Sequence, residues 1–87
     1  MELIGRRREG NVEYRDAQPG DYWKPDYEHR QPNEWWFRDP TGSFGRVVHH
    51  QVAEHDDGTI TVHPSILRTG GDTPGFHGWL KRGVWSW

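Results

Sequence analysis

The chain is expected to fold as an all-β (β-dominated) domain: a small antiparallel sheet or partial barrel of about five or six short strands, with a long irregular N-terminal arm. Two patterns indicate this. No segment has the period of an amphipathic helix. From residue 34 onward, short runs of β-branched and aromatic residues alternate with turn sequences. We therefore predict one domain, in which residues 1–33 form the arm and residues 34–87 form the β core.

The arm is predicted to contain at most one short strand. Its one alternating stretch runs from Asn11 to Arg15, and several prolines interrupt the residues that follow. We expect three aromatic residues to anchor the arm on the core: Tyr22, Trp23 and Tyr27.

The β core is predicted to begin with a hairpin. Glu34 to Arg38 is rich in aromatic residues that favour strands, and Asp39-Pro40-Thr41-Gly42 is a type I turn sequence. Ser43 to Val48 would return as the partner strand. Alternation along the first strand places Trp35 and Phe37 on one face, and Trp36 and Arg38 on the other.

A second hairpin is predicted around the loop Asp56-Asp57-Gly58, whose glycine suits a left-handed bulge position. If His55 faces Thr59, the strands 48–55 and 59–63 pair so that Val52 faces Val62 and Gln51 faces His63. One face of this hairpin is then apolar and would point to the core. It comprises Val48, His50, Val52, Ile60 and Val62; the opposite face comprises His49, Gln51, Ala53, His55, Thr59, Thr61 and His63.

The last part of the chain is predicted to form two more short strands. Pro64 has no N–H to donate, so the strand that precedes it should end there or become an edge. Residues 69–75 form a loop by composition. Residues 76–80 and 84–87 would be the final strands, joined at Lys81-Arg82-Gly83.

Composition limits the classes of partner. Only 31% of the 87 residues are hydrophobic, yet there are 6 Trp, 3 Tyr and 3 Phe, which is more aromatic surface than so small a core requires. We therefore expect self-association into a homo-oligomer or a partner that covers some of these rings. A net charge of -2 argues against non-specific binding of duplex nucleic acid. The cluster Arg6-Arg7-Arg8 is interpreted as solvated surface charge.

Other features narrow the setting. The chain has no cysteine, which excludes disulfides and thiolate metal sites. No apolar run approaches the roughly 20 residues that span a bilayer, so no membrane association is expected. The N-terminus also lacks the apolar core of a signal peptide, which favours the cytoplasm.

One long motif resembles a known group of proteins. It runs from His50 to Leu67 and reads His-x-Val-x-Glu-His-x-Asp-Gly-Thr-Ile-Thr-Val-x-Pro-Ser-Ile-Leu. Together with His77-Gly-Trp-Leu80 and Arg82-Gly-Val-Trp85, it resembles small uncharacterised proteins of actinobacterial phages. Pro19-Gly-Asp-Tyr-Trp23 and Trp36-x-x-Asp-Pro-x-Gly42 look like N-terminal markers of the same group.

The resemblance covers most of residues 19–87, and it implies a phage accessory protein with a β fold that acts in the host cytoplasm. The chain is also distantly similar to a bacterial and phage domain of unknown function whose members carry cysteines that look like zinc ligands. This chain has no cysteine, and only His77 matches that ligand set. The resemblance therefore carries over no zinc site and no catalytic residue.

Interleaved aromatic and basic residues are the candidates for a binding site. An exposed ring beside a guanidinium suits a ligand that combines a base with a phosphate. Trp36 beside Arg38 is such a pair, and Arg46 and Arg68 are further anion-contact candidates. His77 and Trp79 form a second group, since Gly78 between them allows a ligand or another backbone to approach closely.

The six histidines suggest a weaker alternative, a metal site. His49 and His63 are expected near one another on the polar face of the second hairpin, and His55 could join them. The spacing matches no established metal motif, so we expect no cofactor and assign no catalytic residue.

The function predicted from the sequence is therefore a phage accessory binding module rather than an enzyme. It would bind a host protein, or sequester a nucleotide-type small ligand, through exposed aromatic and arginine residues. Two alternatives stay open: a histidine-dependent, metal-binding hydrolase or nuclease, and a minor structural component of the virion.

Overall fold

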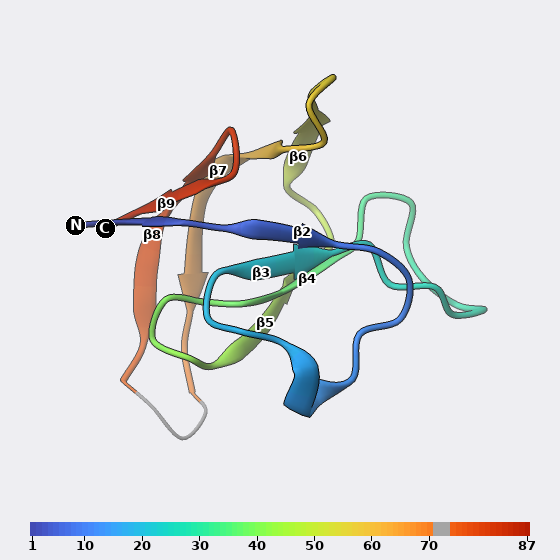
Figure 1. The fold of residues 1–87 in the computed structure, drawn as a ribbon, viewed down its shortest axis with the longest axis horizontal. Coiled ribbons are helices and arrows are strands. Elements are labelled where there is room, and N and C mark those ends of the chain that lie inside the picture. Colours follow the sequence, from blue (N-terminus) through green and yellow to red (C-terminus); the bar gives the residue numbers. More distant parts are fainter. Residues whose placement is uncertain (71–73) are drawn as a thin grey trace.

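The computed structural model describes residues 1–70 and 74–87, and the predicted all-β class is confirmed: these residues form two sheets and no α-helix (Figure 1). The first sheet has five strands in the order β1 (Glu2–Ile4), β9 (Val84–Ser86), β8 (Phe76–Lys81), β7 (Ile60–Arg68) and β6 (Gln51–Glu54). The second has four strands in the order β2 (Arg6–Arg8), β3 (Asp21–Trp23), β4 (Trp35–Arg38) and β5 (Phe44–Val47). The two sheets do not close into a barrel.

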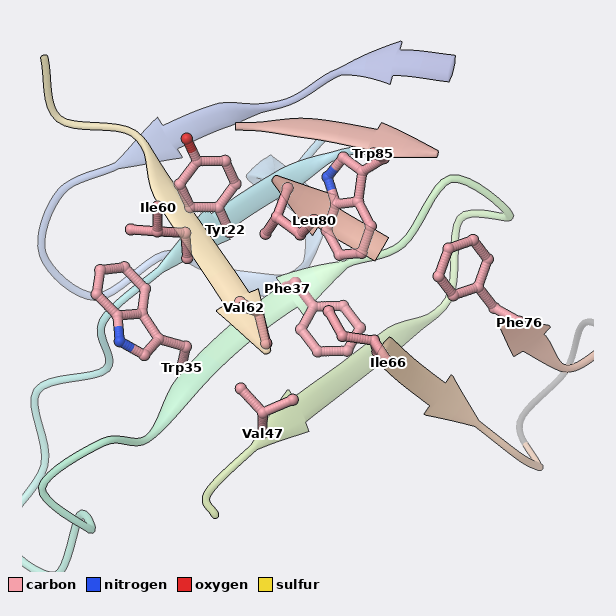
Figure 2. Packing of buried hydrophobic residues seen from close by; sticks show 10 residues of the cluster. All are labelled: Tyr22, Trp35, Phe37, Val47, Ile60, Val62, Ile66, Phe76, Leu80 and Trp85. Carbon is pink, nitrogen blue, oxygen red and sulfur yellow. The ribbon is translucent and has the colours of Figure 1, made fainter. Parts of the chain in front are cut away.

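The hydrophobic core lies between the two sheets (Figure 2). Large rings fill it, because the chain has few aliphatic residues to contribute. The second sheet contributes Tyr22, Trp35, Phe37 and Val47, and the first sheet contributes Ile60, Val62, Ile66, Phe76, Leu80 and Trp85. The ring centroids of Phe37 and Trp85 lie 5.4 Å apart, so aromatic contacts cross between the sheets.

The chain passes from the first sheet to the second at Gly5, between β1 and β2. A Cβ atom at this position would lie 2.7 Å from the carbonyl oxygen of Gly20 and 2.9 Å from that of Gly83. The Gly5 amide also donates a 2.7 Å hydrogen bond to the Gly83 carbonyl. Only glycine leaves room for this crossing, which holds the two sheets together at one corner.

The prediction of a long irregular arm with at most one strand is wrong. Residues 1–33 contain β1, β2 and β3. The stretch expected as a strand, Asn11 to Arg15, contains none, and a 3-10 turn, Tyr14–Asp16, begins within it. Strand β2 pairs parallel to β3, and β1 pairs antiparallel to β9. These pairings join segments far apart in the sequence, so local alternation carries no signal of them.

A buried carboxylate accounts for two of the three arginines of β2. Asp21 lies within the protein and accepts hydrogen bonds from Arg6 and Arg8 and from the backbone N–H of Gln18. Burial alone would raise the pKa of Asp21, but these bonds outweigh it and lower the pKa below its usual value. Arg7 points the other way, with its guanidinium 5.1 Å from the centre of the Trp35 ring.

The register predicted for the second hairpin is confirmed. Val52 faces Val62 and Gln51 faces His63, and the His55 N–H donates to the Thr59 carbonyl at 2.8 Å. Gly58 has a φ of 87°, the left-handed conformation that the loop requires. Strand β6 is shorter than predicted, because residues 48–50 form a bend before it. Val47 is therefore the fully buried valine of this region, while Val48 is only half-buried.

Strand β7 continues past Pro64 to Arg68. Its pairing with β6 ends at His63, and from there it pairs with β8 alone after a register shift between Val62 and Ile66. The final strands β8 and β9 form where predicted. Residues 71–73 of the predicted loop 69–75 lie outside the described residues.

A buried ion pair joins the two sheets near that loop. Asp39, in the turn between β4 and β5, receives a hydrogen bond from the guanidinium of Arg68 on β7. The Asp39 side chain is fully buried and that of Arg68 is 7% exposed. Asp39 also accepts from the Thr41 N–H at 2.8 Å and from the Ser43 N–H at 3.2 Å, so the same carboxylate closes the turn and anchors β7.

Candidate ligand-binding site

The six residues predicted to bind a ligand lie in three different places. Trp36, Arg38 and Arg46 lie on β4 and β5, on the face of the second sheet that points away from the core. His77 and Trp79 lie on β8, on the outer face of the first sheet. Arg68 lies between the sheets, as described above.

Strand register brings an indole and a guanidinium together on the second sheet. Trp36 faces Arg46, and Arg38 faces Phe44, in the antiparallel pairing of β4 with β5. Side chains directly opposite one another in such a pair have Cβ atoms about 4.5–5.5 Å apart. Trp36 and Arg46 are therefore immediate neighbours on the outer face.

The 3-10 turn adds a third ring to this face. The Tyr14 ring stacks on the Phe44 ring with centroids 4.0 Å apart and an angle of 22° between the ring planes. Between this stacked pair and Trp36 is a cleft of about 300 Å³. Its lining residues are Tyr14, Trp36, Phe44, Gly45 and Arg46, and we call it the aromatic cleft.

A buried carboxylate holds the Trp36 ring in place. Glu34 is 1% exposed and accepts hydrogen bonds of 2.6 Å from the Trp36 indole N–H and from the Tyr27 hydroxyl, and one of 3.1 Å from the Gln31 N–H. Burial alone would raise the pKa of Glu34, but these bonds, with the nearby Arg46 charge, lower it. The indole N–H is thus committed within the protein, and Trp36 offers the cleft its ring surface.

The two arginines of this face differ in availability. The Arg38 guanidinium donates to the Ala17 carbonyl at 2.6 Å and to the Gly42 carbonyl at 2.8 Å, so it holds the segment before β3 and the β4–β5 turn. The Arg46 side chain is 63% exposed, and its closest carboxylate oxygen, on Glu34, is 3.8 Å away. Arg46 therefore has donors that an anion in the cleft can reach.

Arg68 has a structural role, which removes it from the predicted binding set. Besides Asp39, its guanidinium donates to the carbonyl oxygens of Gly70 and Pro74 and to the Thr41 hydroxyl. These contacts join both ends of the segment that follows β7. With a 7% exposed side chain, Arg68 is not accessible to an external anion.

The second predicted group lies on an open sheet surface. His77 and Trp79 point the same way from β8, with ring centroids 5.5 Å apart, and the Trp79 side chain is half-exposed. His77 Nε2 lies 3.0 Å from the Ser65 hydroxyl. A Cβ at Gly78 would collide with the Ser86 carbonyl of β9, so this glycine accommodates the neighbouring strand.

The histidines are dispersed. His55 lies 2.7 Å from the Thr61 hydroxyl, His63 is exposed on β7, and His49 belongs to the bend before β6. Within residues 1–70 and 74–87, no three His, Cys, Asp or Glu side chains are grouped closely enough to hold a metal ion. The same residues contain no helix long and apolar enough to cross a membrane.

Three residues of this site were not predicted from the sequence to belong to it: Tyr14, Phe44 and Glu34. Phe44 had an available signal, because alternation with Arg46 in the predicted strand puts both side chains on one face. Tyr14 reaches the site only through its tertiary contact with Phe44, which lies 30 residues later in the chain.

Comparisons of the chain with known protein families, with curated proteins and with solved structures found no match.

Proposed function

We propose that the protein is a binding module that captures a nucleotide-type ligand, a planar base carrying a phosphate, in the aromatic cleft. The base would lie against the rings of the cleft, and the phosphate would accept hydrogen bonds from Arg46. The observation that carries this proposal is the pairing of the Trp36 ring surface with an exposed, weakly engaged guanidinium across one register position.

The expected interaction energies and the volume of the aromatic cleft support a small ligand at this site. Stacking of a base on an aromatic side chain contributes about 1–3 kcal/mol, and a hydrogen bond to a charged group about 1.5–3 kcal/mol. The cleft volume of about 300 Å³ is at the lower end of the range typical of small-molecule sites, about 300–1,000 Å³. The site therefore suits one nucleoside and its phosphate.

The hydrogen bond of Trp36 argues against a proline-rich peptide, another ligand of aromatic grooves. Such a peptide presents carbonyl groups that need donors. The Trp36 indole N–H is already donated to Glu34, and the remaining donors at the cleft belong to Arg46 and the Tyr14 hydroxyl. A base can stack through its ring face while its polar edges stay in solvent, which favours a stacked base.

The biological setting is part of the same proposal. The motif resemblance to phage proteins supports an accessory protein in the host cytoplasm, where a nucleotide-type signal would be sequestered. Capture of a host protein through the same rings is the competing binding function. The dispersed histidines of the described residues give no support to the alternative of a histidine-dependent, metal-binding hydrolase.

Ligand-observed NMR with AMP and adenosine as probes tests the proposal. Saturation transfer from the protein should be strongest at the base protons of both probes. Arg46→Ala should weaken AMP binding about tenfold or more. The variant loses a hydrogen bond to a charged group, which contributes about 1.5–3 kcal/mol, and about 1.4 kcal/mol corresponds to a factor of ten in affinity. The same variant should leave adenosine binding nearly unchanged, since adenosine has no phosphate.

Controls come from the opposite sheet. Lys81→Ala removes an exposed cation, and Trp79→Ala removes a half-exposed ring, both on β8. Neither change should alter AMP binding, whereas Tyr14→Ala in the cleft should weaken both probes. Absence of saturation transfer to AMP in the unmodified protein would refute the proposal and turn attention to a protein partner.

A further inference from the structure

A second cavity lies next to the aromatic cleft. It has a volume of about 420 Å³ and is lined by Tyr27, His29, Gln31, Glu34, Arg46, Val48 and His49. Its lining residues come from the connection between β3 and β4, from β5 and from the bend that follows β5. The connection between β3 and β4 projects to one side of the sheets (Figure 1). We call it the histidine cavity.

Arg46 lines both cavities and therefore marks where they adjoin. Trp36 and Tyr27 lie on either side of this junction: Trp36 lines the aromatic cleft, Tyr27 lines the histidine cavity, and their ring centroids are 5.7 Å apart. Both side chains donate to Glu34. The boundary between the cavities is thus a fixed structure with one exposed cation at its centre.

The charges that line the histidine cavity limit the kind of ligand group that can bind in it. Its arginine and carboxylate side chains are Arg46 and Glu34. Since Arg46 would already hold the phosphate at the junction, a further phosphate in this cavity would meet no additional arginine or lysine. The phenol, the amide and the two imidazoles instead suit a neutral group with a ring and polar edges.

We infer that the full ligand is a dinucleotide: two nucleosides joined by a single phosphodiester, with one base in the aromatic cleft, the phosphate at Arg46 and the second nucleoside in the histidine cavity. This inference rests on the proposed function, because it extends the same site. It identifies a ligand class that a single cavity of about 300 Å³ would not suggest.

The test compares three probes by isothermal titration calorimetry and NMR: AMP, ADP and the dinucleoside monophosphate ApA. ApA should bind at least about tenfold more tightly than AMP, since a second base contributes contacts without a second association step. ADP should bind no more tightly than AMP, because its added phosphate meets no added positive charge.

The double variant His29→Ala/His49→Ala tests whether the tighter binding of ApA comes from the histidine cavity. Both histidines are exposed, so their removal should leave the fold unchanged, which thermal unfolding verifies. The variant should lower ApA affinity several-fold and leave AMP affinity as it was. Arg46→Ala should weaken both ligands.

The outcomes separate the two proposals. If AMP binds but ApA binds no more tightly, or if the histidine variant weakens AMP as much as ApA, the dinucleotide inference is wrong and the proposed function stands. Tighter binding of ADP than of ApA would make the histidine cavity a phosphate pocket and would also overturn the inference. If neither AMP nor ApA binds, both proposals fail.

Discussion

Removal of the Asp39 carboxylate should be among the most damaging single changes in this protein. Asp39→Ala leaves the Arg68 guanidinium within the protein without its counter-charge, where that side chain is only 7% exposed. Loss of one partner of a buried ion pair costs about 3–5 kcal/mol. A domain of 87 residues is stable by roughly 4–13 kcal/mol, so the variant should lose a large share of its stability.

Asp39→Asn distinguishes the contribution of the Asp39 charge from that of its hydrogen bonds to the turn. The Thr41 and Ser43 N–H groups donate to Oδ1, whereas Arg68 donates to Oδ2. Asparagine keeps an acceptor for the two backbone bonds, each contributing about 0.5–1.5 kcal/mol. It should therefore lose roughly 1–3 kcal/mol less than the alanine variant. The difference between the two variants measures the closure of the β4–β5 turn, less the cost of placing the asparagine NH2 against the Arg68 guanidinium.

Urea denaturation, monitored by tryptophan fluorescence, gives the free energy of unfolding of each variant. The comparison requires that the slope of this free energy with urea concentration is the same for each variant. Arg68→Met and the double variant Asp39→Ala/Arg68→Met complete a double-mutant cycle. The double variant should be less destabilised than the sum of the two single changes, because it leaves no unpaired charge. Additivity within about 0.5 kcal/mol would show that the pair is not coupled and would refute this reasoning.

Three further changes have definite expected outcomes. Since hydrogen bonds lower the pKa of Asp21, its contribution to stability is present above pH 3.8 and is lost as pH falls through the lowered value; urea titrations of Asp21→Asn and the unmodified protein should therefore converge in acid. Gly5→Ala should cost about 1–3 kcal/mol by calorimetry, because its Cβ would collide with two carbonyl oxygens. Trp79→Ala should change the melting temperature little, and a large drop would mean that this half-exposed ring is structural.

The sequence predicted those parts of the fold in which the decisive forces are local. The loop Asp56-Asp57-Gly58 sets the register of β6 and β7, because a left-handed glycine at its end fits only one hairpin geometry. Alternation correctly put Trp35 and Phe37 on one face of β4 and Trp36 on the other, although it did not indicate which of the two faces is buried. These inferences need only neighbours a few residues apart.

The N-terminal strands could not be predicted in this way. Each of β1, β2 and β3 has three residues, too few to display a period. The run Arg6-Arg7-Arg8 resembles solvated surface charge until Asp21, 13 to 15 residues away, is known to be buried beside it. Two of those arginines then compensate the buried carboxylate, which is a tertiary relation and not a local one.

Arg68 was misassigned for a related reason. If β7 ends at Pro64, Arg68 lies in a loop and is free to contact an anion. Once the strand continues, alternation with the buried Ile66 turns Arg68 inward, toward Asp39. Since the partner is 29 residues earlier in the chain, in a turn whose sequence already explains its aspartate, nothing local revealed the ion pair.

The surplus of aromatic residues inferred from composition occupies a second layer on the outer face of the four-stranded sheet. Trp23 is 2% exposed and contacts Phe44 edge-on, and Tyr14 stacks on Phe44 from outside. Trp36 completes the layer, held by Glu34. These rings are therefore in contact with one another or with Glu34 before any ligand arrives. A base that binds there loses its own freedom but orders few protein side chains, which lowers the entropic cost of binding and favours capture of a small ligand by a protein of this size.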